Sequence, residues 1–160
     1  MTNQQMSMFA ATPPRDTLAE AAAQVKAKLD DGVTCPCCQQ FAKRYRRKIH
    51  ATMAACLIVL YRADDPMTSK EIGDQLRRLK TAYATGEIGK LCYWGLVVEA
   101  GNKRWRLTDD GKRFVEGTHR VRRFALVFNG KCEATDGEFV GIRDALSDRF
   151  DYDELMRTKP

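Results

Sequence analysis

Hydrophobic positions follow a helical period over most of the chain and a two-residue period in its later part. Apolar residues recur at helical spacing over residues 18–29, directly after a capping box in which Thr17 and Glu20 can satisfy backbone amides at a helix start. A second capping box, Thr68 with Glu71, opens a further short helix. The pattern predicts a mainly α fold of the α+β type.

One long helix is predicted over residues 41–62, after a turn that holds three cysteines. Its first half is basic, and its second half, MAACLIVLY, is apolar on every side, which is typical of a helix at the centre of a core. Pro66 and the two aspartates before it end this helix. Another helix is predicted over residues 86–94, with Cys92 facing inward and Gly95 as a left-handed stop.

The two-residue period marks a β-hairpin. Residues 97–100 and 103–107 alternate in polarity on either side of the turn Gly101-Asn102. Thr108 then caps a short helix. The hairpin therefore follows four predicted helices in the chain.

The tail predicts a small β-meander and two short helices. Strands are expected over residues 123–128, 131–134 and 138–142, because Asn-Gly and Asp-Gly dipeptides separate them. Short helices are expected over residues 143–148 and 152–157.

These elements suggest four segments in the chain. We expect a flexible tail over residues 1–14 and an N-terminal helix with the cysteine turn over residues 15–40. A helical domain with its hairpin spans residues 41–120, and an appendage of strands and helices spans residues 121–160.

Charge is unevenly distributed in this chain of net charge +6. Residues 43–62 hold six Lys/Arg and no acid, and residues 101–123 hold eight Lys/Arg against three acids. Residues 124–160 are acidic, with five Lys/Arg against eight acids. Two basic blocks favour a polyanionic partner, although a single basic run is usually a solvated face.

Three stretches in order resemble the winged helix-turn-helix domains of MarR-like and PadR-like proteins. They are MTSKEIGDQL for the first helix of the turn motif, GEIGKLCYWGLV for the recognition helix and its strand, and RWRLTDDGKRFVEG for the closing strand and cap. The match covers about residues 43–117. The resemblance implies a third helix in the major groove of DNA, with the hairpin as a wing on the phosphates.

The chain also resembles, over nearly its whole length, a group of bacterial and phage proteins that have no established activity. The shared stretches are CPCC, YRRK, LCYWGL and FDYDELM. This resemblance implies an origin in a mobile element.

The basic blocks and the resemblance together give the expected DNA-binding residues. They are Thr85, Lys90 and Tyr93 on the third helix; Asn102, Lys103, Arg104 and Arg106 on the wing; Arg120, Arg122 and Arg123 after it; and Lys43, Arg44, Arg46, Arg47 and Lys48 on the basic helix. The outward-facing side chains of the third helix include one acid and no Arg or Asn. We therefore expect the wing to contribute more DNA-binding energy than this helix.

Cys35 and Cys38 have the Cys-x-x-Cys spacing that lets two thiolates reach one zinc ion. Structural zinc takes four ligands, and His50 and Cys56 would point to different sides of the predicted helix. A two-fold dimer could complete the shell with the same pair from each chain. A redox pair and plain structural thiols at a turn remain alternatives.

Several function classes are not expected. The chain has no apolar run long enough for a membrane span and no secretion signal, so we expect a cytoplasmic protein with reduced cysteines. No arrangement of residues points to catalysis. The expected function is a homodimeric DNA-binding regulator, with zinc as the one cofactor suggested. The alternative is a phage-type factor that docks on a host nucleic-acid machine, such as a defence complex, and inhibits or redirects it.

Overall fold

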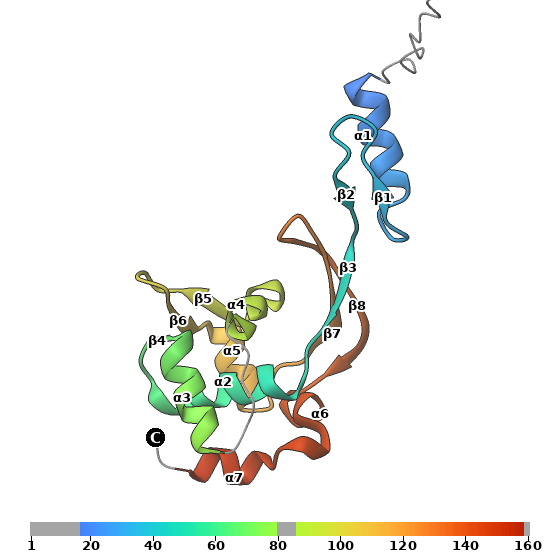
Figure 1. Ribbon diagram of the computed structural model, residues 1–160. Coiled ribbons are helices and arrows are strands. Elements are labelled where there is room, and N and C mark those ends of the chain that lie inside the picture. Colours follow the sequence, from blue (N-terminus) through green and yellow to red (C-terminus); the bar gives the residue numbers. More distant parts are fainter. Residues whose placement is uncertain (1–16, 80–85, 159–160) are drawn as a thin grey trace, which may run out of the picture. The chain divides into compact units, whose positions relative to one another are not determined.

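The computed structural model describes residues 17–79 and 86–158, which fall into two compact units that divide between Arg44 and Tyr45 (Figure 1). The described residues form seven α-helices and three small antiparallel sheets. The expected α+β class is therefore confirmed. Among the described helices, none has the length and apolarity needed to cross a membrane. The flexible tail expected over residues 1–14 lies outside the described residues.

The first unit consists of helix α1 (Leu18–Ala27) and a two-stranded hairpin, β1 (Val33–Thr34) with β2 (Phe41–Ala42). The capping box predicted at the start of α1 is present. Leu29 is buried, and its carbonyl accepts a hydrogen bond from the Arg44 amide at 2.7 Å.

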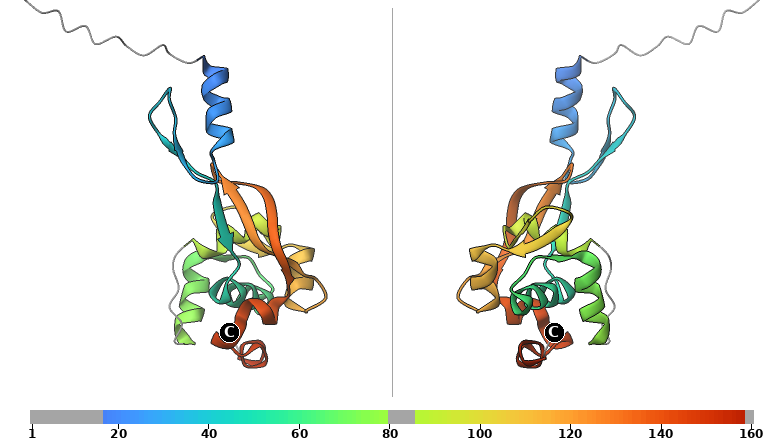
Figure 2. Two further views of the ribbon diagram at one scale, coloured as in Figure 1. Left: turned by 90° about the vertical axis from the view of Figure 1, so that its right-hand side faces the viewer. Right: turned by 90° about the vertical axis from the view of Figure 1, so that its left-hand side faces the viewer.

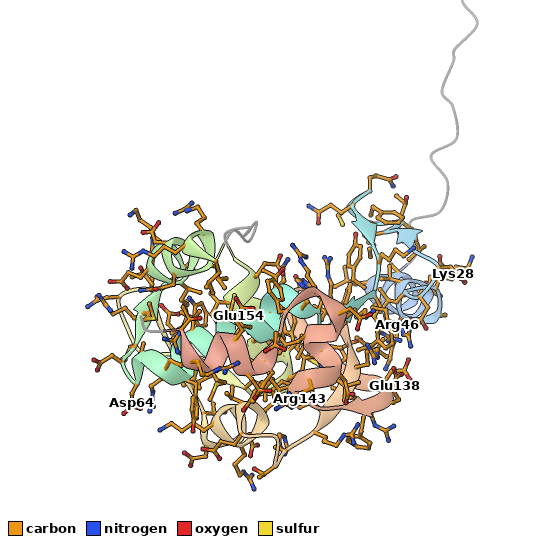
Figure 3. The ribbon with its side chains drawn as sticks, turned by 90° about the horizontal axis from the view of Figure 1, so that it is seen from below. Lys28, Arg46, Asp64, Glu138, Arg143 and Glu154 are labelled. Atoms are coloured by element: carbon orange, nitrogen blue, oxygen red, sulfur yellow. The ribbon has the colours of Figure 1, made fainter. Side chains whose placement is uncertain are left out.

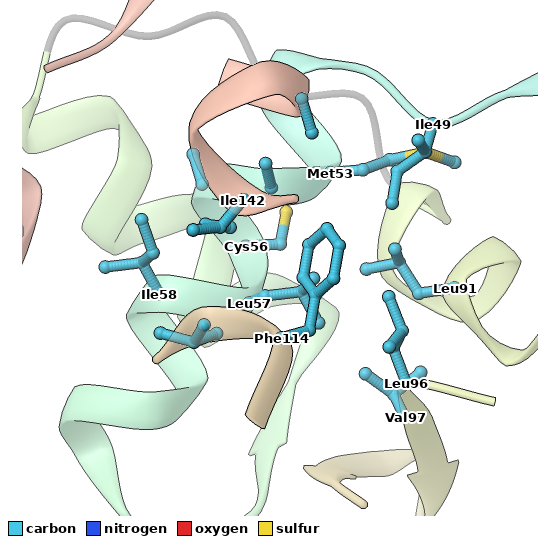
Figure 4. Packing of buried hydrophobic residues seen from close by; sticks show 14 of the residues in the cluster. Ile49, Met53, Cys56, Leu57, Ile58, Leu91, Leu96, Val97, Phe114 and Ile142 are labelled. Atoms are coloured by element: carbon cyan, nitrogen blue, oxygen red, sulfur yellow. The ribbon is translucent and has the colours of Figure 1, made fainter. Parts of the chain in front are cut away.

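Helix α2 (Ala51–Ala63) is the centre of the second unit (Figure 4). Its first ten residues are all buried, because apolar side chains cover every side of the helix. Met53, Leu57 and Ile58 are among the largest fully buried side chains of the core. Cys56 is buried there as well, as its apolar neighbours predicted. The helix ends at Asp64, which adopts the left-handed conformation (φ 52°).

The prediction of one long helix over residues 41–62 is wrong for the first half of that range. Tyr45–Lys48 forms strand β3, which pairs antiparallel with β7 (Val121–Phe128). The register joins Tyr45 to Val127 and Lys48 to Phe124. A run of Arg and Lys is compatible with a helix locally, but a strand far along the sequence supplies the hydrogen bonds that hold it extended.

A three-stranded sheet of order β3-β7-β8 replaces the predicted meander, with β8 spanning Lys131–Val140. The Asn129-Gly130 turn between β7 and β8 is confirmed, and both residues have positive φ, as a two-residue hairpin requires. The second predicted turn, at Asp136-Gly137, is wrong. β8 continues through it, and an irregularity opposite Arg122–Phe124 absorbs the change of register.

The second sheet of this unit has the order β4-β6-β5. Along the chain its elements are β4 (Met67–Thr68), α3 (Ser69–Arg78), α4 (Glu87–Lys90), the 3₁₀ helix η1 (Leu91–Trp94), β5 (Val97–Glu99), β6 (Arg104–Leu107) and α5 (Asp109–Val115). The capping box at the start of α3, the β5–β6 hairpin and the Thr108 cap of α5 were all predicted from the sequence, and all three are present.

Residues 86–94 form one α-helical turn followed by one 3₁₀ turn rather than a continuous α-helix. Gly95 ends the segment with φ 69°, and the Leu96 amide folds back to the Leu91 carbonyl at 3.3 Å, as predicted. The inward orientation predicted for Cys92 is wrong, because this thiol is exposed.

Two short helices complete the unit, α6 (Ile142–Leu146) and α7 (Tyr152–Arg157), joined by the 3₁₀ helix η2 (Ser147–Arg149). Both α6 and α7 pack on α2, as Figure 2 shows from two sides. The Tyr152 hydroxyl donates a hydrogen bond to the Val115 carbonyl at 2.9 Å. Both helices agree with the sequence prediction to within one or two residues.

Replacing Gly111 with Ala should destabilise the protein by about 3 kcal/mol, the upper end of the usual overpacking cost. A Cβ atom at Gly111 would lie 2.0 Å from the Leu96 carbonyl oxygen, so the backbone of α5 or of Leu96 must move. Urea unfolding measures the loss. The matched control is Lys112→Ala on the same helix, which should leave stability nearly unchanged. Equal stability of the two variants would contradict this packing.

Candidate functional site

Exposed basic and polar residues gather on the β5–β6 hairpin. Asn102 and Lys103 form its turn with φ 51° and 58°. Arg104 is held by the Pro66 carbonyl at 2.5 Å and by Glu71 at 3.1 Å. In the described part of the chain, Lys103 and Arg106 have no ion-pair partner. These two cations, rather than Arg104, are the ones available to an anionic partner.

A groove of about 310 Å³ lies between the β3–β7–β8 sheet and the α4–η1 segment. Its lining comprises Tyr45, Arg47, Lys90, Tyr93, Val127, Asn129 and Gly130. The Arg47 guanidinium carbon lies 5.0 Å from the centre of the Tyr45 ring. The Trp94 indole N–H donates to the Arg122 carbonyl at 2.7 Å, which fixes η1 against β7. The groove thus combines aromatic faces with two cations.

Glu87 organises the cations beside this groove. Its carboxylate lies 2.8 Å from His50 Nε2 and 2.8 Å from Lys90 Nζ, and its side chain is only 12% exposed. Burial acts to raise the pKa of Glu87, but the hydrogen bonds and charges of Lys90 and His50 outweigh burial and hold the pKa below its ordinary 4.5. Glu87 therefore fixes Lys90 in place while that side chain stays 40% exposed.

Three arginines of the sheet and the turn before it pair with carboxylates. Figure 3 labels Arg46 and Glu138, which belong to two of these pairs. Arg46 pairs with Asp136 at 3.0 Å and stacks over Phe124, with its guanidinium carbon 3.4 Å from the ring centre. Arg123 pairs with Glu138, and Arg120 pairs with Asp144. The basic block is therefore less positive at the surface than its composition indicates.

Arg122 differs from its neighbours because it makes no ion pair in the described residues, although its charge helps to lower the pKa of Asp136. It donates to the Gly137 carbonyl at 2.7 Å and stacks over Phe139 at 4.2 Å. Phe139 is 53% exposed, so this part of the sheet presents an aromatic side chain under a guanidinium.

In the first unit, Cys35 and Cys38 lie on the loop of the β1–β2 hairpin. The Cys35 amide donates to the Gln40 carbonyl at 2.8 Å, and the Gln39 amide donates to the Cys35 carbonyl at 2.9 Å. Gln39 has φ 61°, which turns the loop back on itself. Hydrogen bonds from the backbone amides of Cys38 and Cys37 lower the pKa of the Cys35 thiol.

Within the described ranges, no group of three or more His, Cys, Asp or Glu side chains is arranged to hold a metal ion. Lys43 and Arg44 follow the hairpin, and Arg44 pairs with Asp30 at 2.9 Å. A single copy of the hairpin thus offers two thiols at metal-binding spacing, and the neighbouring thiol of Cys37 does not complete a three-ligand group with them.

The structure brings together only part of the predicted site. Arg47, Lys90 and Tyr93 share the groove, whereas Lys43 and Arg44 belong to the other unit. Lys48 lies on the opposite sheet face from Arg47 and helps to lower the pKa of Glu138. Thr85 lies outside the described residues.

Tyr45 and Asn129 line the groove, and neither was predicted from the sequence as a site residue. Once residues 45–48 are known to be a strand, the alternation places Tyr45 and Arg47 on one face. That alternation was the available signal for Tyr45, and the helical interpretation concealed it.

No protein-family model, curated protein or solved structure matches this chain.

Replacing Glu87 with Gln should lower the free energy of unfolding by about 1 kcal/mol at pH 7, the scale of a charged hydrogen bond at a partly buried site. The folded-state pKa of Glu87 is lowered, so its contribution is present above pH 4.5 and is lost as the pH falls through the folded-state value. Denaturant unfolding of both proteins from pH 7 to pH 3 tests this.

The control for this experiment is Asp148→Asn, which removes an exposed carboxyl with no ion pair in the described residues. It should change stability little at any pH. A Glu87→Gln deficit that stays constant down to pH 3 would contradict the electrostatic account.

Proposed function

We propose that the second unit contains a winged helix-turn-helix domain that binds duplex DNA and catalyses no reaction. The observation that carries the proposal is the element order α2, β4, α3, α4–η1, β5, β6 combined with the sheet order β4-β6-β5. In a winged helix the strand between the first two helices pairs with the last strand of the wing, and this sheet has the same arrangement. The fold alone does not determine function, so the available cations must supply the second argument.

The candidate recognition segment is short. α4 and η1 together span Glu87 to Trp94, with one α turn and one 3₁₀ turn. A base-reading helix places several side chains of one face into the major groove, and this segment offers few. The proposal is therefore a DNA-binding regulator that gains most of its affinity from phosphate contacts and discriminates weakly between sequences.

Lys103 and Arg106 on the wing make no ion pair in the described residues, which suits them to phosphate contacts. Asp64, Asp65 and Glu116 line the same pocket as Arg106, so Lys103 is the less screened of the two. The groove beside α4 adds Arg47 and Lys90. Its tyrosines offer faces on which a sugar or an unstacked base can lie. Arg104 acts differently, since it ties the wing to Glu71 at the start of α3.

A second candidate function is docking on a protein that handles nucleic acid. The exposed Phe139 with Arg122 stacked on it, surrounded by neutralised arginines, favours this candidate. Aromatic and Arg side chains are enriched at protein interfaces. The two candidates differ in their salt dependence, because phosphate neutralisation weakens steeply with salt and an aromatic interface does not.

The double variant Lys103→Ala, Arg106→Ala should weaken duplex binding on every DNA sequence. It should also reduce the slope of log affinity against log salt by about 1.8, since each lost phosphate contact removes about 0.9. The measurement is a fluorescence anisotropy titration of two unrelated duplexes at several salt concentrations.

The matched control for the wing is Arg149→Ala, Arg157→Ala. It removes the same charge from exposed positions on η2 and α7, at the end of the unit away from the wing (Figure 1). The control should keep the parent slope. If the wing variant also keeps the parent slope, DNA binding through the wing is refuted.

Arg47→Ala should reduce duplex affinity about fivefold, a typical loss for one charged contact near a surface. Lys48→Ala is the matched control, because Lys48 is the next residue of β3 and has the same charge on the opposite face. An equal loss in both variants would indicate that general charge, rather than the groove, is responsible.

A further inference from the structure

We propose that the β1–β2 hairpin holds one zinc ion between two copies of this chain, with Cys35 and Cys38 of each copy as its four ligands. This inference is independent of DNA binding. It makes the N-terminal unit a metal-dependent dimerisation element.

The loop geometry favours metal ligation over a plain turn. Two backbone hydrogen bonds close the loop between Cys35 and Gln40, and Gln39 adopts the left-handed conformation that lets the chain turn sharply behind Cys38. The backbone amides of Cys37 and Cys38 hydrogen-bond to the Cys35 sulfur, so they fix the position of this ligand atom in the loop. A zinc tetrathiolate carries a net negative charge, and such amide hydrogen bonds offset part of it.

The loop geometry also argues against a redox pair. A thioredoxin-like dithiol opens a helix after a β-strand, whereas Cys35 follows β1 and precedes a short turn and strand β2. Cys37 and Cys38 are exposed and Cys35 is half-buried, so an ion can reach the pair from outside the chain.

The ligand count calls for a second copy. Structural zinc takes four Cys or His ligands, and the hairpin supplies two at the required spacing. Residues 1–16, 80–85 and 159–160 contain no Cys or His in the sequence. In the second unit, Cys56 is buried in the core and His50 is bound to Glu87, and no group of three or more His, Cys, Asp or Glu side chains in the described residues could hold a metal ion. A symmetric pair of hairpins fills the shell with identical ligands.

Zinc binding to four thiols releases four protons and involves no electron transfer. The ion stabilises only the assembly that completes its shell, so metal binding and dimerisation are linked. The chain should dimerise when zinc is added and separate when zinc is removed.

The experiment uses the full-length chain, reduced and freed of metal by a chelator. Zinc is added in steps, and light scattering reports the molar mass while elemental analysis of the dialysed protein reports the metal. The expected result is one zinc ion per two chains with a doubling of mass. Adding the chelator again should restore the monomer.

Two variants locate the ligands. Cys35→Ser, Cys38→Ser should bind no zinc and stay monomeric. Cys37→Ser is the matched control from the same loop: it keeps the backbone amide that supports Cys35, so it should bind zinc and dimerise like the parent. Circular dichroism verifies that each variant is folded.

Three results would overturn the proposal. One zinc ion per monomeric chain would mean that other side chains of the same copy complete the shell. A folded parent protein that retains no zinc would leave the cysteines as plain thiols. Loss of zinc in Cys37→Ser would show that Cys37 is needed for binding and that the proposed set of ligands is wrong.

Discussion

Complete burial of α2 is the constraint on which the rest of the second unit depends. A helix that is apolar on all sides needs neighbours on all sides, and α3, α5, α6 and α7 all pack against it. Ile49, at the entry to the helix, is fully buried, and its amide bonds to the Arg123 carbonyl at 3.0 Å. The chain therefore enters the core along β7 as a strand, which brings the basic residues before α2 into a sheet.

The extended conformation of β3 before α2 determines on which face of the sheet each of its charged residues lies. Because β3 alternates, Tyr45 and Arg47 line the groove beside α4, while Arg46 and Lys48 lie on the other face. Asp136, Glu138 and Asp144 then neutralise the arginines of the sheet and its edge. Arg46, Arg120 and Arg123 are therefore neutralised, whereas Lys103 at the hairpin tip and Arg47 in the groove make no ion pair in the described residues. That distribution suits a partner that carries spaced negative charges.

Features fixed by neighbours in sequence were predictable. The capping boxes at Thr17 and Thr68 need only residues three positions apart, and the Asn129-Gly130 turn needs only two adjacent residues that accept positive φ. Gly111 belongs to the Leu-Thr-x-x-Gly stretch that suggested the fold. A side chain does not fit at this position, because the Leu96 carbonyl oxygen lies where a Cβ atom would be.

Features fixed by distant partners were not predictable. β3 depends on pairing with β7, and the groove depends on β3, so neither was evident from local pattern. Cys92 was misplaced because η1 has three residues per turn, which rotates its faces away from those of an α-helix. Composition gives the number of arginines in the basic blocks but not their carboxylate partners. Arg104 of β6 was therefore predicted to contact DNA, whereas in the structure Glu71 binds it.

The most direct test of the central claim is an amide chemical-shift map of the isotope-labelled chain with a short DNA duplex, recorded at low and at high salt. The account predicts that the largest changes fall on residues 101–106 and on the groove residues of β3, and that they fade as salt rises. Changes centred on Phe139 that persist at high salt, or no changes on the wing and groove at low salt, would contradict it.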